Sequence, residues 1–292
     1  MNHYSPLRYP GGKGKIINFF KEIIKENLLY DGIYVEPYTG GASVALSLLF
    51  NEYVSKIIIN DLDYSIYSFW FSVLNHTEEL CKLIFDTPVD VSIWEKQHKV
   101  QKNKDKHNVL EIGFSTFYLN RTNHSGIINA GVIGGKNQLG KWKIDARFNK
   151  KDLINRIQRI SFYKKNIELY NLDAMILVNK IKNKINKRTL FYFDPPYYNK
   201  GKDLYLNHYN DKDHIFIADE IKKINPYKWV LTYDNIDFIS NLYKDFRQMK
   251  YVLNYSALKA CKGEELIIFS NNIYIPPTLF SASAEVKACH SN

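Results

Sequence analysis

"GIYVEPYTGGASVALSLLFNEYVSKIIIND", residues 32–61, determines the fold class of this chain. Its apolar start predicts a short strand, the paired glycines predict a turn, and the apolar stretch after them predicts a helix. A second short apolar strand ends at Asn60 and Asp61. This order of strand, helix and strand favours a parallel sheet that helices cover.

The same alternation extends to both sides of this stretch. Residues 12–29 carry apolar side chains at helical spacing, and residues 64–74 predict a buried helix. Further along the chain, strands are predicted at 166–173, 188–194, 227–234 and 264–271, and helices at 174–185 and 213–225. We therefore expect an α/β fold in which one sheet has helices on both faces.

Residues 76–159 interrupt the alternation. They are predicted to be helical as far as Arg121, and then become polar and rich in glycine, which favours a β-hairpin. We interpret them as a mainly helical insertion between two parts of one domain, 1–75 and 160–280. Residues 281–292 are small and polar, and we expect a flexible tail.

The glycine turn and the next acidic residue indicate a ligand. Gly40 and Gly41 lie between a strand and a helix, so unpaired N–H groups and the positive helix end meet at the edge where open sheets bind ligands. Asp61 is positioned to accept hydrogen bonds from a ribose, although it could equally cap the next helix. A dinucleotide and S-adenosylmethionine both fit, and the absence of G-x-G-x-x-G from this turn argues against NAD.

"TLFYFDPPYYNKG", residues 189–201, ends a predicted core strand with a carboxylate, two prolines and tyrosines that we expect to be exposed. Pro195 and Pro196 stiffen the backbone and have no N–H, so nearby carbonyls remain available as acceptors beside Asp194. Such acceptors suit an exocyclic amine, and Tyr197 offers a face on which a flat heterocycle can stack. The alternative is an ordinary Asp-Pro turn with tyrosines that pack on the surface.

Together, "LRYPGGKGK" at 7–15, "EPYTGGASV" at 36–44 and "FDPPYY" at 193–198 resemble the Dam-type adenine-specific DNA methyltransferases. "FYLNRTNHSG" at 117–126 and "EELIIFS" at 264–270 also fall where that family has similar segments. The resemblance implies a Rossmann-like methyltransferase sheet with an inserted target-recognition domain. It implies methyl transfer from S-adenosylmethionine to the exocyclic N6 of adenine in DNA.

The resemblance also assigns roles to individual residues. The implied catalytic residues are Asp194, Pro195, Pro196 and Tyr197, and the implied cofactor contacts are Tyr9, Lys13, Glu36, Tyr38, Gly40, Asp61, Leu62, Asp173 and Asp194. The family usually has tryptophan at the position of Tyr9 and a second glycine at the position of Ala42. Asp173 could instead cap the following helix.

A basic surface is expected to hold the DNA. The net charge is +10, and from residue 121 to residue 151 the only acidic residue is Asp145. Charge of this kind suits a polyanion, although it also keeps ordinary proteins soluble. The predicted DNA contacts are Arg121, Asn123, His124, Lys136, Lys141, Lys143 and Arg147. The target base must be flipped out of the duplex before it can react.

The rest of the composition favours a cytoplasmic protein. Three cysteines form neither a disulfide framework nor a zinc pattern, so no metal is expected. No signal peptide and no membrane span are predicted. The expected partner is double-stranded DNA, and a restriction endonuclease that acts on the same site would not be physically bound.

Three other interpretations remain open at this point. The chemistry could act on adenine in RNA, the fold could be a catalytically silent nucleic-acid-binding protein, or the enzyme could use a nicotinamide cofactor. Intact Asp194 and Asp61 argue against a silent protein, and the prolyl-tyrosine segment has no role in a nicotinamide enzyme. The insertion lacks a string like "RYGYNG" that is typical of GATC-specific members, so the target sequence is left unassigned.

Overall fold

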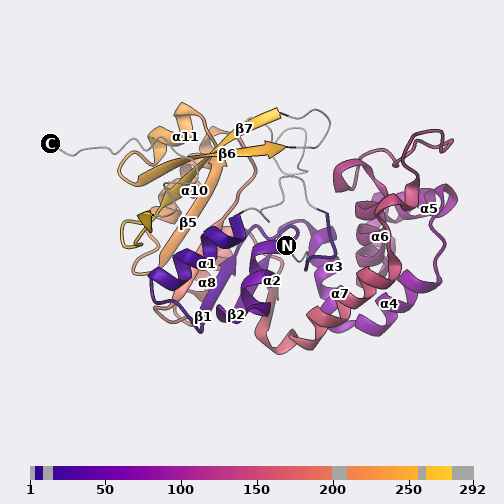
Figure 1. Ribbon diagram of the computed structural model, residues 1–292, viewed down its shortest axis with the longest axis horizontal. Helices are drawn as coiled ribbons and strands as arrows, with labels where there is room; N and C mark the ends of the chain where they lie inside the picture. Colours follow the sequence, from indigo (N-terminus) through magenta and orange to yellow (C-terminus); the bar gives the residue numbers. More distant parts are fainter. Residues whose placement is uncertain (1–3, 9–15, 199–208, 256–260, 278–292) are drawn as a thin grey trace.

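A seven-stranded sheet forms the centre of the computed structural model (Figure 1), which describes residues 4–8, 16–198, 209–255 and 261–277. The strand order is β3-β2-β1-β4-β5-β7-β6. The strands are β1 (Gly32–Glu36), β2 (Val54–Asn60), β3 (Ile167–Tyr170), β4 (Thr189–Phe193), β5 (Lys228–Asp234), β6 (Arg247–Tyr255) and β7 (Cys261–Phe269). β1 to β5 pair in parallel, whereas β7 is antiparallel to both of its neighbours.

Helices cover both faces of the sheet, as predicted. One core layer joins the sheet to α1 (Ile17–Glu26), α2 (Ser43–Phe50) and α3 (Tyr64–Asn75). The other joins it to α8 (Ala174–Ile181), α10 (Asp211–Lys222) and α11 (Asp237–Leu242). Because both faces are covered, a central strand such as β4 is buried along its whole length, which explains its continuous apolar run.

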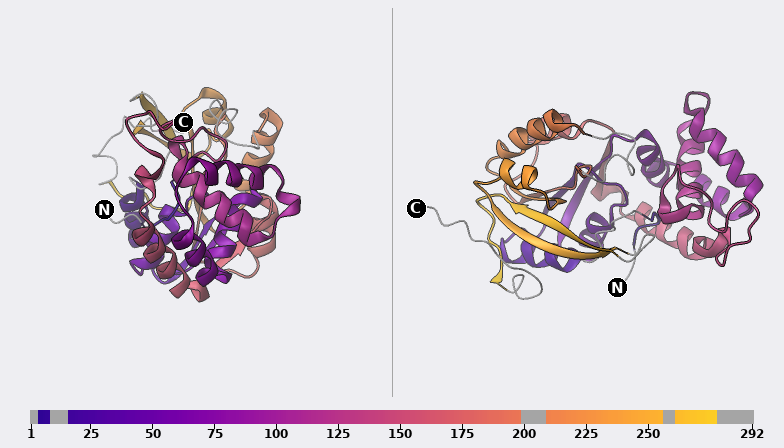
Figure 2. Two further views of the ribbon diagram at one scale, coloured as in Figure 1. Left: turned by 90° about the vertical axis from the view of Figure 1, so that its right-hand side faces the viewer. Right: turned by 90° about the horizontal axis from the view of Figure 1, so that it is seen from above.

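The helices of the insertion lie beside the sheet as a separate group (Figure 2). They are α4 (Thr77–Asp86), α5 (Val91–Lys102), α6 (Val109–Thr122) and α7 (Lys150–Phe162). α6 packs along α3, where the rings of Phe69 and Phe117 stack with centroids 5.9 Å apart. Asn108 and Glu111 form a capping box that fixes the start of α6.

Two sequence-based expectations about strands need correction. The predicted β-hairpin of the insertion is reduced to one isolated antiparallel bridge between Asn123 and Val132, because Gly126, Gly134 and Gly135 have positive φ angles that turn the chain out of the extended conformation. The sheet is parallel only as far as β5. β6, which the sequence analysis did not predict, forms an antiparallel pair with β7.

Candidate active site

The carboxyl ends of the five parallel strands lie along one edge of the sheet. β1, β2, β4 and β5 end at or next to Glu36, Asp61, Asp194 and Asp234, and Asp173 follows β3. Parallel strands bring residues that are far apart in the sequence to the same edge, which is where open α/β sheets bind ligands. Four of these five carboxylates are the acidic residues predicted to belong to the site.

The turn after β1 adopts a left-handed conformation at two positions. Gly40 has a φ of +47° and Ala42, the N-cap of α2, has a φ of +50°. Alanine tolerates this region less well than glycine, so the turn is held by its contacts. Thr39 donates its backbone N–H to the Asn60 carbonyl, and its hydroxyl donates to the Glu36 carbonyl. Replacement of the family's second glycine by Ala42 therefore leaves a left-handed turn in place.

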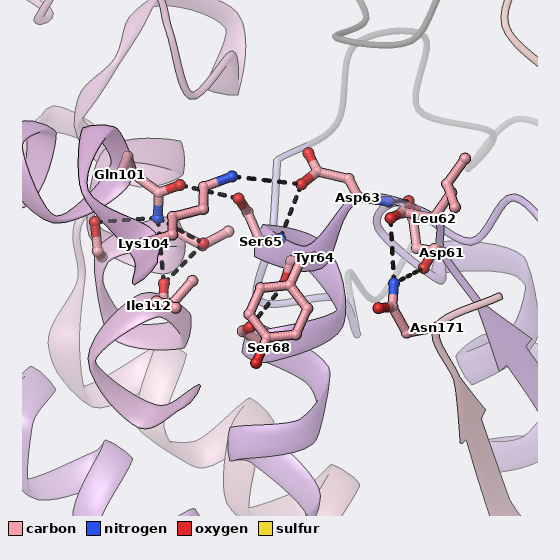
Figure 3. Close-up of polar contacts among 12 residues, drawn as sticks. Asp61, Leu62, Asp63, Tyr64, Ser65, Ser68, Gln101, Lys104, Ile112 and Asn171 are labelled. Carbon is pink, nitrogen blue, oxygen red and sulfur yellow. Dashed lines mark hydrogen bonds and ion pairs between the residues drawn. The ribbon is translucent and has the colours of Figure 1, made fainter. Parts of the chain in front are cut away.

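Asp61 is bound to this turn. Its Oδ2 accepts the Gly40 N–H at 2.9 Å, and its Oδ1 accepts the N–H of Asp63 at 3.0 Å. Burial, and secondarily the charge of Asp63, raise the pKa of the Asp61 carboxyl to about 7. Asp63, and not Asp61, is the N-cap of α3, where it accepts the N–H of Ser65 at 2.8 Å. The carboxylate of Asp61 is thus not used as a helix cap (Figure 3).

Asn60 connects the end of β2 to the segments that follow β1 and β3, a role that was not predicted from the sequence. Its side-chain amide donates to the carbonyls of Pro37 and Leu172, both at 2.9 Å, and its Oδ1 accepts the Leu172 N–H. Asn171 adds a bond from its amide to the Asp61 carbonyl at 2.7 Å (Figure 3). A buried amide that satisfies several backbone groups fixes their spacing. In the sequence, only the position of Asn60 next to Asp61 could have indicated this role.

The remaining predicted cofactor residues are placed differently. Asp173 caps α8 by accepting the N–H groups of Met175 and Ile176, which is the alternative role that the sequence allowed. Leu62 is an exposed apolar residue beside Asp61 (Figure 3). Tyr38 is partly buried, and burial raises the pKa of its hydroxyl well above the ordinary value. Tyr9 and Lys13 lie outside the described residues.

Asp194 is oriented by two hydroxyl groups from neighbouring strands. The Thr232 hydroxyl in β5 donates to its Oδ1 at 2.6 Å, and the Tyr192 hydroxyl lies 2.9 Å from the same Thr232 oxygen. Since the Thr232 hydrogen is directed at Asp194, the Tyr192 hydroxyl must be the donor in the second contact. The half-buried carboxylate is therefore held in one orientation by a chain of hydrogen bonds.

The two tyrosines after Pro196 do not form the exposed pair that the sequence predicted. Tyr197 is only 7% exposed, and its hydroxyl donates to Glu265 of β7. Tyr198 donates its N–H to Asp234 Oδ1 at 3.0 Å, and its ring lies beside Phe238. The Tyr197 hydroxyl and the Tyr198 backbone N–H thus each have a carboxylate acceptor, on β7 and β5 respectively. The segment after Asp194 is thereby fixed to two further strands.

The family described as D12 class N6 adenine-specific DNA methyltransferase matches this chain over residues 9–256. The chain belongs to this family. The type II methyltransferase M.MjaIII of Methanocaldococcus jannaschii is 26% identical over 280 residues, which cover 89% of this chain and 93% of that protein.

Solved structures with a similar fold are more distant. A SAM-dependent methyltransferase from Agrobacterium tumefaciens has a TM-score of 0.39 at 10% identity, covering 87% of this chain and 61% of that chain. The rRNA methyltransferase aviRa from Streptomyces viridochromogenes has a TM-score of 0.35 at 8% identity, covering 88% and 84%. The assignment of activity rests on the family match and not on these likenesses.

As a D12-class enzyme, the protein methylates the N6 atom of adenine in DNA, with S-adenosylmethionine as the methyl donor. The predicted reaction and cofactor are confirmed. The strand-end residues fit this cofactor chemically, because Asp61 supplies an acceptor for hydroxyl groups next to a left-handed turn at the start of α2. The family assignment disfavours the three alternatives, which were an RNA methyltransferase, a nicotinamide-dependent enzyme and a catalytically silent nucleic-acid-binding protein.

Two residues of this D12-class enzyme that were predicted to contact DNA are structural. Asn123 is fully buried, accepts the indole N–H of Trp94 at 2.6 Å and donates to the carbonyls of Ile127 and Ile128. Arg121 is buried and donates its Nε–H to the Pro6 carbonyl at 2.6 Å. Burial lowers the pKa of Arg121 to about 9. Polar residues in a loop-like sequence can serve to satisfy buried backbone groups, and in this structure both side chains do so.

The other predicted DNA contacts are accessible. The exposed residues of this set are His124, Lys136, Lys141, Lys143 and Arg147. Lys136 forms an exposed ion pair with Glu95 at 3.2 Å, which costs little to exchange for a phosphate. In the described part of the chain, no helix is long and apolar enough to cross a membrane.

Proposed function

We propose that this D12-class methyltransferase is of the Dam type and carries out its chemistry at the edge formed by the ends of β2 and β4. The observation that carries the proposal is the Asp194 carboxylate, which Thr232 and Tyr192 hold on the same edge as Asp61. Asp194 and the carbonyl of Pro195 or Pro196 would each accept one hydrogen of the exocyclic amine. Tyr197 would stack on the base once the site opens around its buried ring.

The proposed chemistry follows from the weakness of an aromatic amine as a nucleophile. When both of its hydrogens are accepted, the nitrogen lone pair withdraws from the ring and becomes available for attack. A fixed carboxylate also stabilises the positive charge that develops on nitrogen. S-adenosylmethionine, when bound, supplies an electrophilic methyl group. Asp194 thus acts through hydrogen bonding and charge, in the orientation that the Thr232 hydroxyl gives it.

The cofactor residues are proposed on the same basis. Asp61 would accept the ribose hydroxyls, and Leu62 would cover one face of the adenine ring. Glu36, Tyr38, Gly40 and Asp173 would line the remainder of the cleft, and Tyr9 and Lys13 would contribute from the amino-terminal motif. Asn60 and Asn171 support this assignment because they hold the three contributing loops at fixed spacing.

We further propose that residues 76–159 recognise the DNA target and that 1–75 and 160–280 form the catalytic domain. The exposed cations of the insertion would hold double-stranded DNA in the cytoplasm while the adenine is flipped out, at a cost of a few kcal/mol. The relative M.MjaIII is a type II methyltransferase, which supports pairing with a restriction endonuclease that acts on the same site without being bound.

Methyl transfer to unmethylated DNA, followed by base-resolution mapping, tests the reaction and the site together. The wild-type protein should label adenine N6 within one short sequence. Asp194→Ala should lose at least about 100-fold in kcat while retaining its thermal stability. Wild-type turnover with an equally active Asp194→Ala variant would refute the catalytic assignment and leave the family activity intact.

A further inference from the structure

The loop of residues 134–143 presents two large apolar side chains to solvent. Leu139 is 85% exposed and Trp142 is 60% exposed. The loop follows the Asn123–Val132 bridge and lies beyond the end of α6, near α5, at the upper right of Figure 1. A single exposed apolar residue is ordinary, but two large ones three positions apart in one loop expose more apolar surface than either would alone.

The conformation of this loop is specified by its own hydrogen bonds. Gln138 donates to the carbonyls of Ile133 and Gly135 at 2.8 and 2.6 Å, and its Oε1 accepts the Ile144 N–H at 2.8 Å. Gly134 has a φ of +84°, and a Cβ there would lie 2.7 Å from the Trp142 carbonyl. The loop therefore holds Trp142 outward in a defined place, which reduces the entropy lost on binding a partner.

Cations surround the exposed ring. The Lys141 ammonium lies 5.9 Å and the Arg147 guanidinium 5.7 Å from the centre of the Trp142 ring. Lys143 is bound to the Gln138 carbonyl at 2.6 Å and is also exposed. The sequence from residue 134 to residue 151 contains a single acid, Asp145. A partner for this surface must combine negative charge with flat or apolar groups at short spacing.

We propose that Trp142 is an aromatic contact of the insertion with duplex DNA. Its ring meets a base or sugar while Lys141 and Arg147 contact the adjacent phosphates. Nucleic acid offers both kinds of group within one nucleotide, and stacking on an aromatic ring tolerates any base. This inference rests on the proposed DNA-binding role of the insertion and extends it to a residue outside the methyl-transfer site.

Tryptophan fluorescence tests the contact directly. The chain has four tryptophans, and Trp70, Trp94 and Trp229 are at most 8% exposed. Quenching by acrylamide therefore reports mainly on Trp142. Added duplex DNA should shield this fluorescence in the wild-type protein, and Trp142→Phe should remove most of the accessible signal before DNA is added. Bound DNA with unchanged quenching would overturn the proposal.

Substitution separates the ring from the charges. Trp142→Ala should weaken duplex binding by about 5- to 100-fold with an unchanged salt dependence, and Trp142→Phe should restore most of the affinity. Lys141→Ala should instead flatten the salt dependence by about one unit. The matched control is Phe162→Ala. Phe162 is the last residue of α7 and is 84% exposed, and this variant should bind duplex DNA as the wild type does.

The outcomes distinguish this inference from the proposed function. If Trp142→Ala binds and methylates DNA as well as the wild type does, the tryptophan contact is wrong and the proposed function stands. If an acidic protein, and not duplex DNA, shields the Trp142 ring from acrylamide, the proposed DNA partner is wrong. If the wild-type protein itself fails to methylate any DNA, the proposed function fails. Near-ultraviolet circular dichroism of each variant verifies that the fold is retained.

Discussion

At the residue scale, we propose that Thr232 positions Asp194 for catalysis, a role that the amino-acid sequence does not indicate. Its hydroxyl is the donor to Asp194 Oδ1, and Tyr192 orients that hydroxyl from the neighbouring strand. A threonine inside the apolar run of β5 resembles any other β-branched strand residue in sequence. Only the parallel pairing of β4 and β5 brings it to the carboxylate.

Thr232→Val removes this hydrogen bond while keeping the shape of the side chain. We expect kcat to fall about 10- to 100-fold, because hydrogen bonds to charged groups contribute about 1.5–3 kcal/mol. Steady-state kinetics measures this fall.

Thr232→Ser is the control for this prediction, since it keeps the hydroxyl and should recover most of kcat. The KM for S-adenosylmethionine should change little in either variant, because the hydroxyl acts on Asp194. An unchanged kcat in Thr232→Val would exclude a positioning role.

If Asp61 binds the ribose as proposed, cofactor affinity should depend on pH near neutrality. Burial raises its pKa from 3.8 to about 7, so ionisation costs stability as the pH rises through this value. Ribose hydroxyls donate to the carboxylate and favour its charged form, so binding should strengthen over the same range. About one-tenth of Asp61 is ionised at pH 6 and about nine-tenths at pH 8, which predicts about ten-fold tighter binding at pH 8.

Isothermal titration of S-adenosylmethionine at several pH values measures this change. Asp61→Asn has no carboxylate to ionise, so the ten-fold increase should be absent and binding should be weak throughout. Subtraction of the variant's profile removes the contribution of groups on the cofactor itself. A wild-type difference of less than two-fold between pH 6 and pH 8 would contradict the assignment.

At the scale of elements, the periodic spacing of apolar residues and the positions of turn residues predicted the helices and parallel strands well. The spacing of apolar residues indicated α1, and the continuous apolar run indicated β4, because burial on one or both faces leaves a direct mark on sequence. β6 was missed because its sequence "RQMKYVLNY" begins with charged and polar residues, as suits a strand at the edge of the sheet.

The loop after α6 shows why site residues are harder to predict than elements. Arg121 and Asn123 look like surface residues in sequence, but they hold the amino-terminal segment and the following turn in place. Asn120 does the same by exchanging hydrogen bonds with the backbone of Arg8. A polar side chain can satisfy buried backbone or bind a ligand, and only the tertiary structure distinguishes the two.

At the scale of the whole molecule, the insertion and the sheet meet at the cofactor edge. The side chain of Gln101 in α5 accepts a hydrogen bond from the Ser65 hydroxyl in α3, and the Lys104 ammonium lies 3.9 Å from the Asp63 carboxylate (Figure 3). Asp63 in turn donates its N–H to Asp61. Gln101 and Lys104 thus join the insertion to the segment after β2 that begins at Asp61, and DNA held by the insertion would lie beside that segment.

Net charge predicts how this assembly responds to salt. The chain carries +10, and the exposed cations of the insertion include Lys136, Lys141, Lys143 and Arg147. If these four contact phosphates, the logarithm of DNA affinity should fall with the logarithm of salt concentration at a slope of about −3 to −4. Binding of fluorescent duplexes between low and physiological salt measures the slope. Lys141→Ala combined with Lys143→Ala should reduce the magnitude of this slope by about two.

Lys25→Ala, on the exposed face of α1, is the control and should leave the slope unchanged. That helix covers the sheet and not the insertion. A slope that responds equally to both changes would mean that DNA is held by diffuse charge and not by this loop.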